Sequence, residues 1–424
     1  MPVVVVACIV ALLAVVGLGC ALTRLLRPSA STNAAGSSET AQEGAASQSG
    51  AAKAATKVSF CAVGDNLINE GGDYTADLLG LADSWAGTTG DGTYDFSPLY
   101  AQLKDTISSY DIALVNQETT LGGSSEFDYQ GYPSYNTPDS CAQAVADAGF
   151  DVVNCNTNHT YDTGVASIEH SQGVWAQQKG VSVIGSYTSQ EDRNNIRVLE
   201  RNGMSIAFLS YCYGQNGYEQ SDLPNDYYAV PFDKDKMREE VTRAKELADA
   251  VVVYMHWGEE NTHDLSDQQK DYASFLAGLD VDLIVGSHAH VIQPVQYVAT
   301  GIRTTDGSGA DANNGVLCVY GLGDFVSGYT LPKTILSGMF TCDFVRDDKG
   351  EVSVSNPVWH GLVEHNAGDV DTVYPLTAYT AELAAQNTLL ARVGENETYS
   401  TSDPLEWARE TTRTVVGDAI PVEV

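Results

Sequence analysis

The chain is poor in basic residues. Its 424 residues include 22 Lys and Arg against 56 Asp and Glu, which gives a formal net charge of −34 at pH 7. A surface of this sign repels nucleic acid and anionic lipid headgroups, so we expect neither as a partner. The same charge favours cations near the surface and gives mild support to metal binding.

Zinc-type cysteine spacing and long repeats are also missing. None of the eight cysteines forms a CxxC pair or shows another zinc-type spacing, so the sequence does not indicate a cysteine-ligated zinc site. An extracellular setting would permit disulfides, but the sequence does not choose among the pairings of the six cysteines beyond Cys20. No repeat of solenoid or propeller period is present.

No Lys or Arg precedes the apolar run of residues 2–22, and the first charges are Arg24 and Arg27. The run is long enough to cross a hydrocarbon core of about 30 Å. We therefore predict that residues 1–28 are a membrane anchor or signal segment. A signal peptide usually begins with a basic region, which this segment lacks. The positive-inside rule alone would place the body in the cytoplasm.

Two other features favour an extracytoplasmic body. The apolar run contains GLGC, which is similar to a lipobox and makes Cys20 a candidate lipid acceptor. Residues 29–56 are mostly Ala, Ser, Gly and Thr and predict a flexible linker. An anchor, a linker and a globular body suit the outer face of a bacterial cell membrane, so we expect a single N-terminal anchor there.

The body alternates strand and helix patterns, which predicts an α/β fold with parallel strands. Asn202-Gly203 predicts a hairpin turn. We place the main domain at 57–365 and a mainly helical extension, packed on it, at 366–424. The predicted strands are 57–65, 111–118, 150–159, 181–185, 250–260, 280–290, 315–326 and 338–345, and the predicted helices include 97–109, 139–149, 166–180 and 234–249.

Five predicted strands end in residues that commonly bind metal or phosphate. The carboxyl ends of parallel strands meet at one edge of a sheet, so these side chains are expected to lie together. The residues are Asp65 with Asn66, Asn116 with Glu118, Asn158 with His159, His256, and His288 with His290.

Each cluster also has a purely structural interpretation. Asp65 could cap a helix or turn, and Glu118 could be a solvated loop charge. Asn158 and His159 could be turn residues, and His256 could lie in the core. The sequence GSHAH is the sharpest signal, because two histidines two positions apart in an extended chain would point to the same side.

Carboxylate, amide and imidazole ligands without thiols suit Mn²⁺, Fe²⁺ or Zn²⁺ better than Ca²⁺. Two such ions, about 3.5–4 Å apart, can activate a water and bind the attacked and leaving oxygens of a phosphoryl group. We therefore expect divalent transition metal ions, two in number, as the cofactors.

The order of the motifs GDN, VNQETTL, NTNHTYDTG, HWGEE, GSHAHVIQPV and GLGDFV resembles that of CapA-type capsule, or poly-γ-glutamate, synthesis proteins. These proteins belong to the calcineurin-like metallophosphoesterase superfamily, and the resemblance covers about residues 58–345. It implies a metallophosphatase-like multi-layer α/β sandwich with mixed sheets, here preceded by the apolar helix and the linker.

The resemblance also implies roles for single residues. Asp65 and His290 would bind the first metal, and Glu118 takes the position of a bridging carboxylate. Asn158, His256 and His288 would bind the second metal, and His159 would be the catalytic general acid. Glu260 matches an acidic position without an assigned role.

Three residues depart from the family pattern. Leu67 stands where related phosphoesterases have a histidine, and Thr157 replaces an asparagine. Asp324, in GDF, replaces a common asparagine and adds an acidic residue near the site. These changes bear on which metal binds more than on whether one binds.

We expect a metal-dependent hydrolase in capsule or poly-γ-glutamate synthesis or export. Its partners would be an anionic polymer or phosphoester substrate, the membrane, and polymer-synthase membrane proteins. Two alternatives stay open: a non-catalytic assembly or export component, and a general phosphodiesterase unrelated to capsule. A Mur-ligase-like synthase gene beside this one would favour polymer synthesis.

Overall fold

The computed structural model describes residues 56–69, 94–300, 315–367, 371–393 and 403–424. The predicted anchor and nearly all of the predicted linker lie outside these ranges. Within them, no helix is both long enough and apolar enough to span a membrane. The cysteines of the described ranges are free thiols, and most of them are buried.

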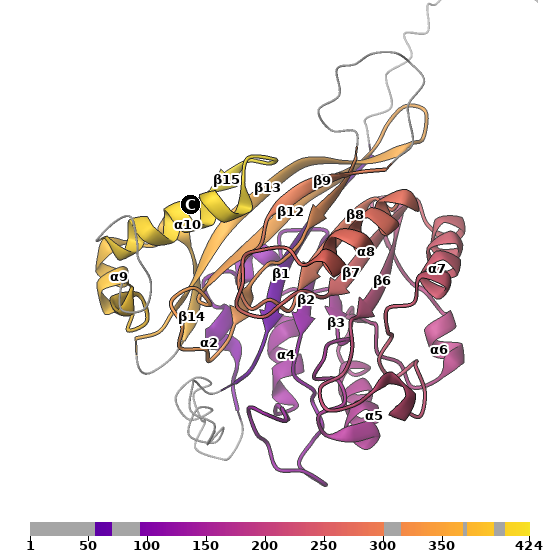
Figure 1. The fold of residues 1–424 in the computed structure, drawn as a ribbon, viewed down its shortest axis with the longest axis horizontal. Coiled ribbons are helices and arrows are strands. Elements are labelled where there is room, and N and C mark those ends of the chain that lie inside the picture. Colours follow the sequence, from indigo (N-terminus) through magenta and orange to yellow (C-terminus); the bar gives the residue numbers. More distant parts are fainter. Residues whose placement is uncertain (1–55, 70–93, 301–314, 368–370, 394–402) are drawn as a thin grey trace, which may run out of the picture. The chain divides into compact units, whose positions relative to one another are not determined.

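The first sheet has nine strands in mixed directions (Figure 1). Its path is β14-β13-β12-β1-β2-β3-β4, with β11 beside β1 and β15 beside β13. Strands β1 to β4 run parallel, whereas β12, β13 and β14 pair in antiparallel fashion. The bounds are β1 Thr56–Asn66, β2 Ile112–Gln117, β3 Val152–Asn154, β4 Ser182–Ile184, β11 Asp324–Val326, β12 Leu336–Arg346, β13 Val352–His365, β14 Thr372–Pro375 and β15 Val422–Glu423.

The second sheet has six strands in the order β5-β6-β7-β8-β10-β9. Strands β6, β7, β8 and β10 are parallel. The predicted hairpin joins β5 and β6, and Asn202 and Gly203 both adopt the positive φ angles, 52° and 76°, that such a tight turn requires. The bounds are β5 Arg197–Arg201, β6 Met204–Cys212, β7 Ala250–His256, β8 Leu283–Ser287, β9 Val295–Ala299 and β10 Gly315–Val319.

The two sheets pack face to face. Alternate residues of β1, such as Val58 and Phe60, join residues of β6 and β7 in one apolar core, and Phe60 stacks on Phe208 at 6.4 Å. The opposite face of β1 carries Cys61 and Val63, which contact the helices that cover the first sheet. This period-two alternation places one sheet face against the other sheet and the second face against helices.

Helices cover both outer faces (Figure 1). Helices α2 to α5 pack on the first sheet, and α7 and α8 pack on the second. The body is therefore a layered α/β structure with two mixed sheets, as predicted. The bounds are α2 Ser97–Tyr100, α3 Lys104–Ile107, α4 Ser140–Asp147, α5 Gly164–Trp175, α6 Gln190–Asn194, α7 Lys234–Leu247, α8 Asp267–Gly278, α9 Ala381–Gln386 and α10 Pro404–Val416.

Several predicted elements differ in detail. The helix expected at 97–109 is broken into α2 and α3, and the strand expected at 315–326 is two strands in different sheets. The long strand β13 was missed, because Asn356, with φ 51°, and the following Pro357 interrupt its alternation where the register with β12 shifts. The C-terminal segment supplies α9 and α10, and it also adds β14 and β15 to the first sheet.

Candidate metal centre

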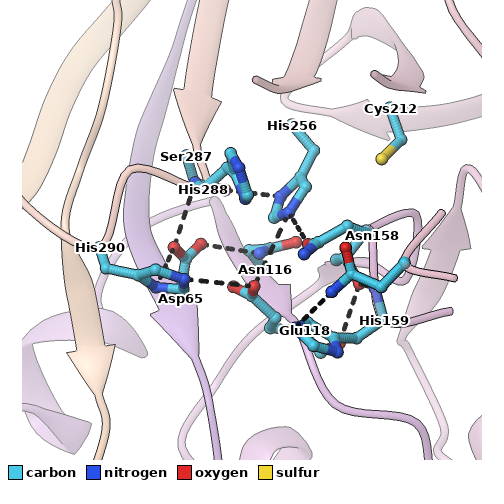
Figure 2. A network of polar contacts seen from close by, with 12 residues as sticks. Asp65, Asn116, Glu118, Asn158, His159, Cys212, His256, Ser287, His288 and His290 are labelled. Atoms are coloured by element: carbon cyan, nitrogen blue, oxygen red, sulfur yellow. Dashed lines mark hydrogen bonds and ion pairs between the residues drawn. The ribbon is translucent and has the colours of Figure 1, made fainter. Parts of the chain in front are cut away.

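The predicted site residues meet where the strand ends of the two sheets face each other (Figure 2). The first sheet contributes Asp65 at the end of β1 and the segments that follow β2 and β3. The second sheet contributes the end of β7 and the turn after β8. The side chains brought together, each at most 3% exposed, are Asp65, Glu118, Asn158, His159, His256, His288 and His290.

Asp65 is held from two sides. Its Oδ1 accepts a hydrogen bond from Asn116 Nδ2 at 2.7 Å, and its Oδ2 accepts from the backbone N–H of His288 at 3.2 Å. Asn116 accepts in turn from Asn154 Nδ2 at 2.6 Å. The buried amides of β2 and β3 therefore fix the orientation of a carboxylate on β1.

Glu118 is buried without a hydrogen bond to its carboxyl group, since neither carboxyl oxygen has a hydrogen-bond partner within the described part of the chain. Its Oε1 lies 3.7 Å from His256 Nε2 and 3.9 Å from His290 Nε2. Burial, and then the nearby charge of Asp65, raise the pKa of Glu118 well above its usual value. A buried carboxylate in this state is costly unless a cation balances it.

His256 links Glu118 to Asn158. Its Nε2 lies 2.8 Å from Asn158 Oδ1, and its Nδ1 lies 3.2 Å from Ser287 Oγ. Burial, followed by the nearby His288 and other imidazoles, lowers the pKa of His256 well below its usual value. The ring is thus neutral at physiological pH, which is the form that binds metals.

His288 and His290 lie at the site, but in a turn and not in the extended strand that we predicted. Strand β8 ends at Ser287, so the two histidines do not lie in an extended chain. Both adopt positive φ angles, 100° and 57°, which are uncommon for residues with a side chain and concentrate at functional sites. The turn still brings the two rings together, with their centroids 5.8 Å apart.

Asp324 is the acidic neighbour of His290. Its Oδ1 lies 2.9 Å from His290 Nδ1, and its side chain is fully buried. Burial opposes a charge on His290, but the carboxylates of Asp324, Glu118 and Asp65 outweigh it and raise the pKa of His290 to about 10. The sequence signalled Asp324 only as a departure from the family pattern.

Three overlapping groups of these residues could hold an ion. In each group, one potential ligand atom per residue lies within 4.8 Å of the others. Several of their buried polar atoms have no hydrogen-bond partner among the described residues, namely both oxygens of Glu118, His288 Nδ1, His290 Nε2 and Asp324 Oδ2. Buried polar atoms are normally satisfied, so this donor set fits divalent cations. The groups are Glu118 with His288 and His290, Asp65 with Glu118 and His256, and Asp65 with His290 and Asp324.

His159 lies beside these groups and belongs to none of them in the described part of the chain. Its Nδ1 is 2.7 Å from Asp162 Oδ2, and its Nε2 is 3.3 Å from Asn216 Nδ2. The same Asp162 oxygen accepts the backbone N–H of Tyr135 at 2.8 Å. The role of Asp162 was missed, although its position three residues after His159 was a signal that could have indicated it.

Fold and site together define an α/β protein with a candidate divalent-metal centre at the strand ends. Residues 59–329, more than half of the chain, match the family described as bacterial capsule synthesis protein PGA_cap. The chain belongs to this family. The resemblance inferred from the motifs is thereby confirmed.

Two curated relatives also have names that refer to capsule or PGA biosynthesis. The chain is 27% identical over 215 residues to the PGA biosynthesis protein CapA of Bacillus subtilis, covering 50% of this chain and 52% of the relative. It is 28% identical over 199 residues to the capsule biosynthesis protein CapA of Bacillus anthracis, covering 45% and 44%. The chain thus matches about half the length of these relatives.

Solved structures are more distant. The chain is similar to the NAD nucleotidase of Haemophilus influenzae, with a TM-score of 0.43 and 11% sequence identity. The similarity covers 85% of this chain and 67% of that protein.

Proposed function

We propose that this protein is a metal-dependent hydrolase of the metallophosphoesterase type that acts in the synthesis or export of a capsule polymer such as poly-γ-glutamate. The observation that carries the proposal is Glu118, a fully buried carboxylate between His256 and His290 with neither oxygen partnered among the described residues. Membership of the capsule synthesis family supports the process.

The donor atoms would divide between two ions. Asp65, Glu118 and His290 would hold the first, and Glu118, Asn158, His256 and His288 would hold the second. When bound, divalent ions supply Lewis acidity to a phosphoryl oxygen and lower the pKa of a water that can attack it.

His159 would move a proton. Its Nδ1 lies against Asp162, so a proton on Nδ1 is held there. Its Nε2, which lies 3.3 Å from Asn216 Nδ2, is the nitrogen left for proton transfer. Protonated at Nε2, His159 would donate to the leaving oxygen as the ester bond breaks, and the carboxylate of Asp162 would stabilise the imidazolium. The edge-on ring of Tyr135, at 4.6 Å, restricts the orientation of the imidazole.

The location and the partners belong to the same proposal. Residues 2–22 would anchor the chain in the cell membrane, with the body outside and polymer-synthase membrane proteins beside it. Protease added to intact cells should then digest the body. Full protection of the body, in cells whose outer proteins are cleaved, would place it in the cytoplasm.

The test of the hydrolase combines metal analysis with turnover. Purified full-length protein should carry about one to two transition ions per chain and hydrolyse phosphodiesters. His159→Asn should keep the ions and lose roughly 10²–10⁴-fold in turnover, the usual effect of a lost general acid. The loss should shrink on an aryl ester, whose leaving group needs no proton.

His170→Asn is the matched control, because His170 is a surface histidine that also pairs with an aspartate, at 2.9 Å. It should leave turnover unchanged. Loss of bound metal in His159→Asn would make His159 a metal ligand instead of a general acid. A metal-loaded wild type that turns over neither phosphoesters nor poly-γ-glutamate would favour a non-catalytic assembly or export component.

A further inference from the structure

Two histidine–carboxylate pairs flank the candidate metal centre. His159 pairs with Asp162 at 2.7 Å, and His290 pairs with Asp324 at 2.9 Å. The second pair is buried throughout, with His290 1% exposed and Asp324 not exposed at all. Both members of the second pair belong to the candidate ligand groups, whereas neither member of the first pair does among the described residues, so we expect different roles for the two carboxylates.

The position of Asp324 follows from the backbone. Strand β11 runs parallel to β1, and Asp324 is the register partner of Asp65. The Asp65 N–H donates to the carbonyl of Gly323 at 3.0 Å. A Cβ on Gly64 would lie only 1.7 Å from that carbonyl oxygen, so a glycine is required for the two strands to approach. Because of this contact, Asp324 lies beside His290.

The ring of His290 has two distinct nitrogens. Nδ1 lies 2.9 Å from Asp324 and 3.9 Å from Asp65, so Asp324 is its hydrogen-bond acceptor and Asp65 is left for other contacts. Nε2 is buried without a partner in the described ranges and lies 3.9 Å from Glu118 Oε1. Once a cation displaces the proton on Nε2, the proton held on Nδ1 by Asp324 remains, and the lone pair of Nε2 is directed to the same space as the unpartnered carboxylate.

We propose that Asp324 is a positioning residue of this centre: it holds Nδ1–H of His290 and thereby aims Nε2 at the ion that Glu118 also binds. The inference rests on the proposed metal site. Carboxylates that orient histidine ligands fix the tautomer and make the ring a stronger donor, and their loss typically costs about 10–100-fold in metal affinity.

The experiment measures Mn²⁺ and Zn²⁺ affinity and stoichiometry of the full-length protein by titration calorimetry against a competing chelator. Asp324→Ala removes the acceptor and should weaken binding about 10–100-fold with unchanged stoichiometry. Asp324→Asn keeps an oxygen that can accept Nδ1–H and should lose less than the alanine variant. Circular dichroism checks that each variant is folded.

Asp162→Ala is the matched control, because it removes the equivalent partner of a histidine outside the ligand groups. It should leave metal affinity within about threefold of wild type. A second readout is the ¹⁵N spectrum of the imidazoles, in which the Nδ1–H signal of His290, assigned by its loss in His290→Gln, should change in Asp324→Ala.

Other results overturn the inference. Loss of a whole ion per chain in both Asp324 variants would make Asp324 itself a ligand. Unchanged affinity in Asp324→Ala would remove it from the centre. A wild type that binds no ion would refute the proposed function as well, whereas a metal-binding wild type with an unaffected variant refutes only the role of Asp324.

Discussion

In the described part of the chain, carboxylates at the amino ends of the parallel strands are hydrogen-bonded, whereas some of those at the carboxyl ends are not. At the amino edge, an aspartate precedes each of four strands and accepts a backbone N–H from the neighbouring strand. At the carboxyl edge, Glu118 and one oxygen of Asp324 have no such partner among the described residues. The four aspartates are Asp111, which accepts from Ser59, Asp151 from Ala113, Asp249 from Ser205 and Asp282 from Val251.

The amino-edge pattern recurs in both sheets. Asp111 and Asp249 accept both the backbone N–H and the hydroxyl of a serine, and each backbone N–H of these aspartates donates to that serine oxygen. Although partial burial opposes ionisation, these hydrogen bonds lower the pKa of both carboxyl groups. Satisfied carboxylates of this kind join strands, whereas unsatisfied ones are available to a ligand.

The largest effect should come from Glu118→Gln. Removing this charge should weaken metal binding by at least about 100-fold, because both predicted ions lose a ligand. The same change should stabilise the ion-free protein by about 1–3 kcal/mol, since an uncompensated buried carboxylate disappears. Calorimetric metal titration and chemical denaturation in chelator would measure both effects. A less stable ion-free variant would mean that Glu118 supports the fold, like the aspartates of the other edge.

The next largest effect should be the loss of folding stability when the ions are removed. The ligands come from both sheets, so bound ions should stabilise the folded state, by about 2.7 kcal/mol at a free ion concentration 100 times the dissociation constant. Thermal unfolding with Mn²⁺ and with chelator would reveal a shift of several degrees. Glu118→Gln should abolish most of the shift, and an equal shift in that variant would locate the stabilising ion elsewhere.

At the amino edge, Asp151→Ala should affect stability alone. Its carboxylate accepts from Ala113 N–H at 3.0 Å and lies 2.9 Å from Arg201 Nη2. The loss of these contacts should cost about 1–3 kcal/mol of unfolding free energy, measured in denaturant. Metal affinity should stay at the wild-type value. Altered metal binding would show that the two edges are coupled.

The last effect, confined to a part of the pH range, is the dependence of stability on the titration of Asp282. Burial raises the pKa of this carboxyl group to about 6, partly offset by the Val251 N–H. A raised folded-state pKa gives stability that is present below about pH 4 and lost as the pH rises through 6. Asp282→Asn should therefore be more stable than wild type by up to about 3 kcal/mol at pH 7.5, and equally stable at pH 4. Denaturant unfolding at both pH values would test this, and an equal difference at both would refute the titration.

The residue types that end the strands can be read from the sequence. Short apolar runs predicted most of the strands, and the polar residues after them predicted Asp65, Glu118 and His256 as site candidates. Helix signals such as Ser266, which caps α8 in a box with Gln269, are equally local. These features depend on neighbours a few residues away, which is why the chain reveals them without its fold.

Only the tertiary structure decided where those residues meet. The carboxylates, the amide and His159 come from the first sheet, and the other three imidazoles come from the second, so the centre exists only because the two sheets pack face to face. The pairing of Asp324 with His290 depends on the parallel contact of β11 with β1, and the aim of His288 depends on a positive φ. Such contacts join residues far apart in the chain, and no local pattern specifies them.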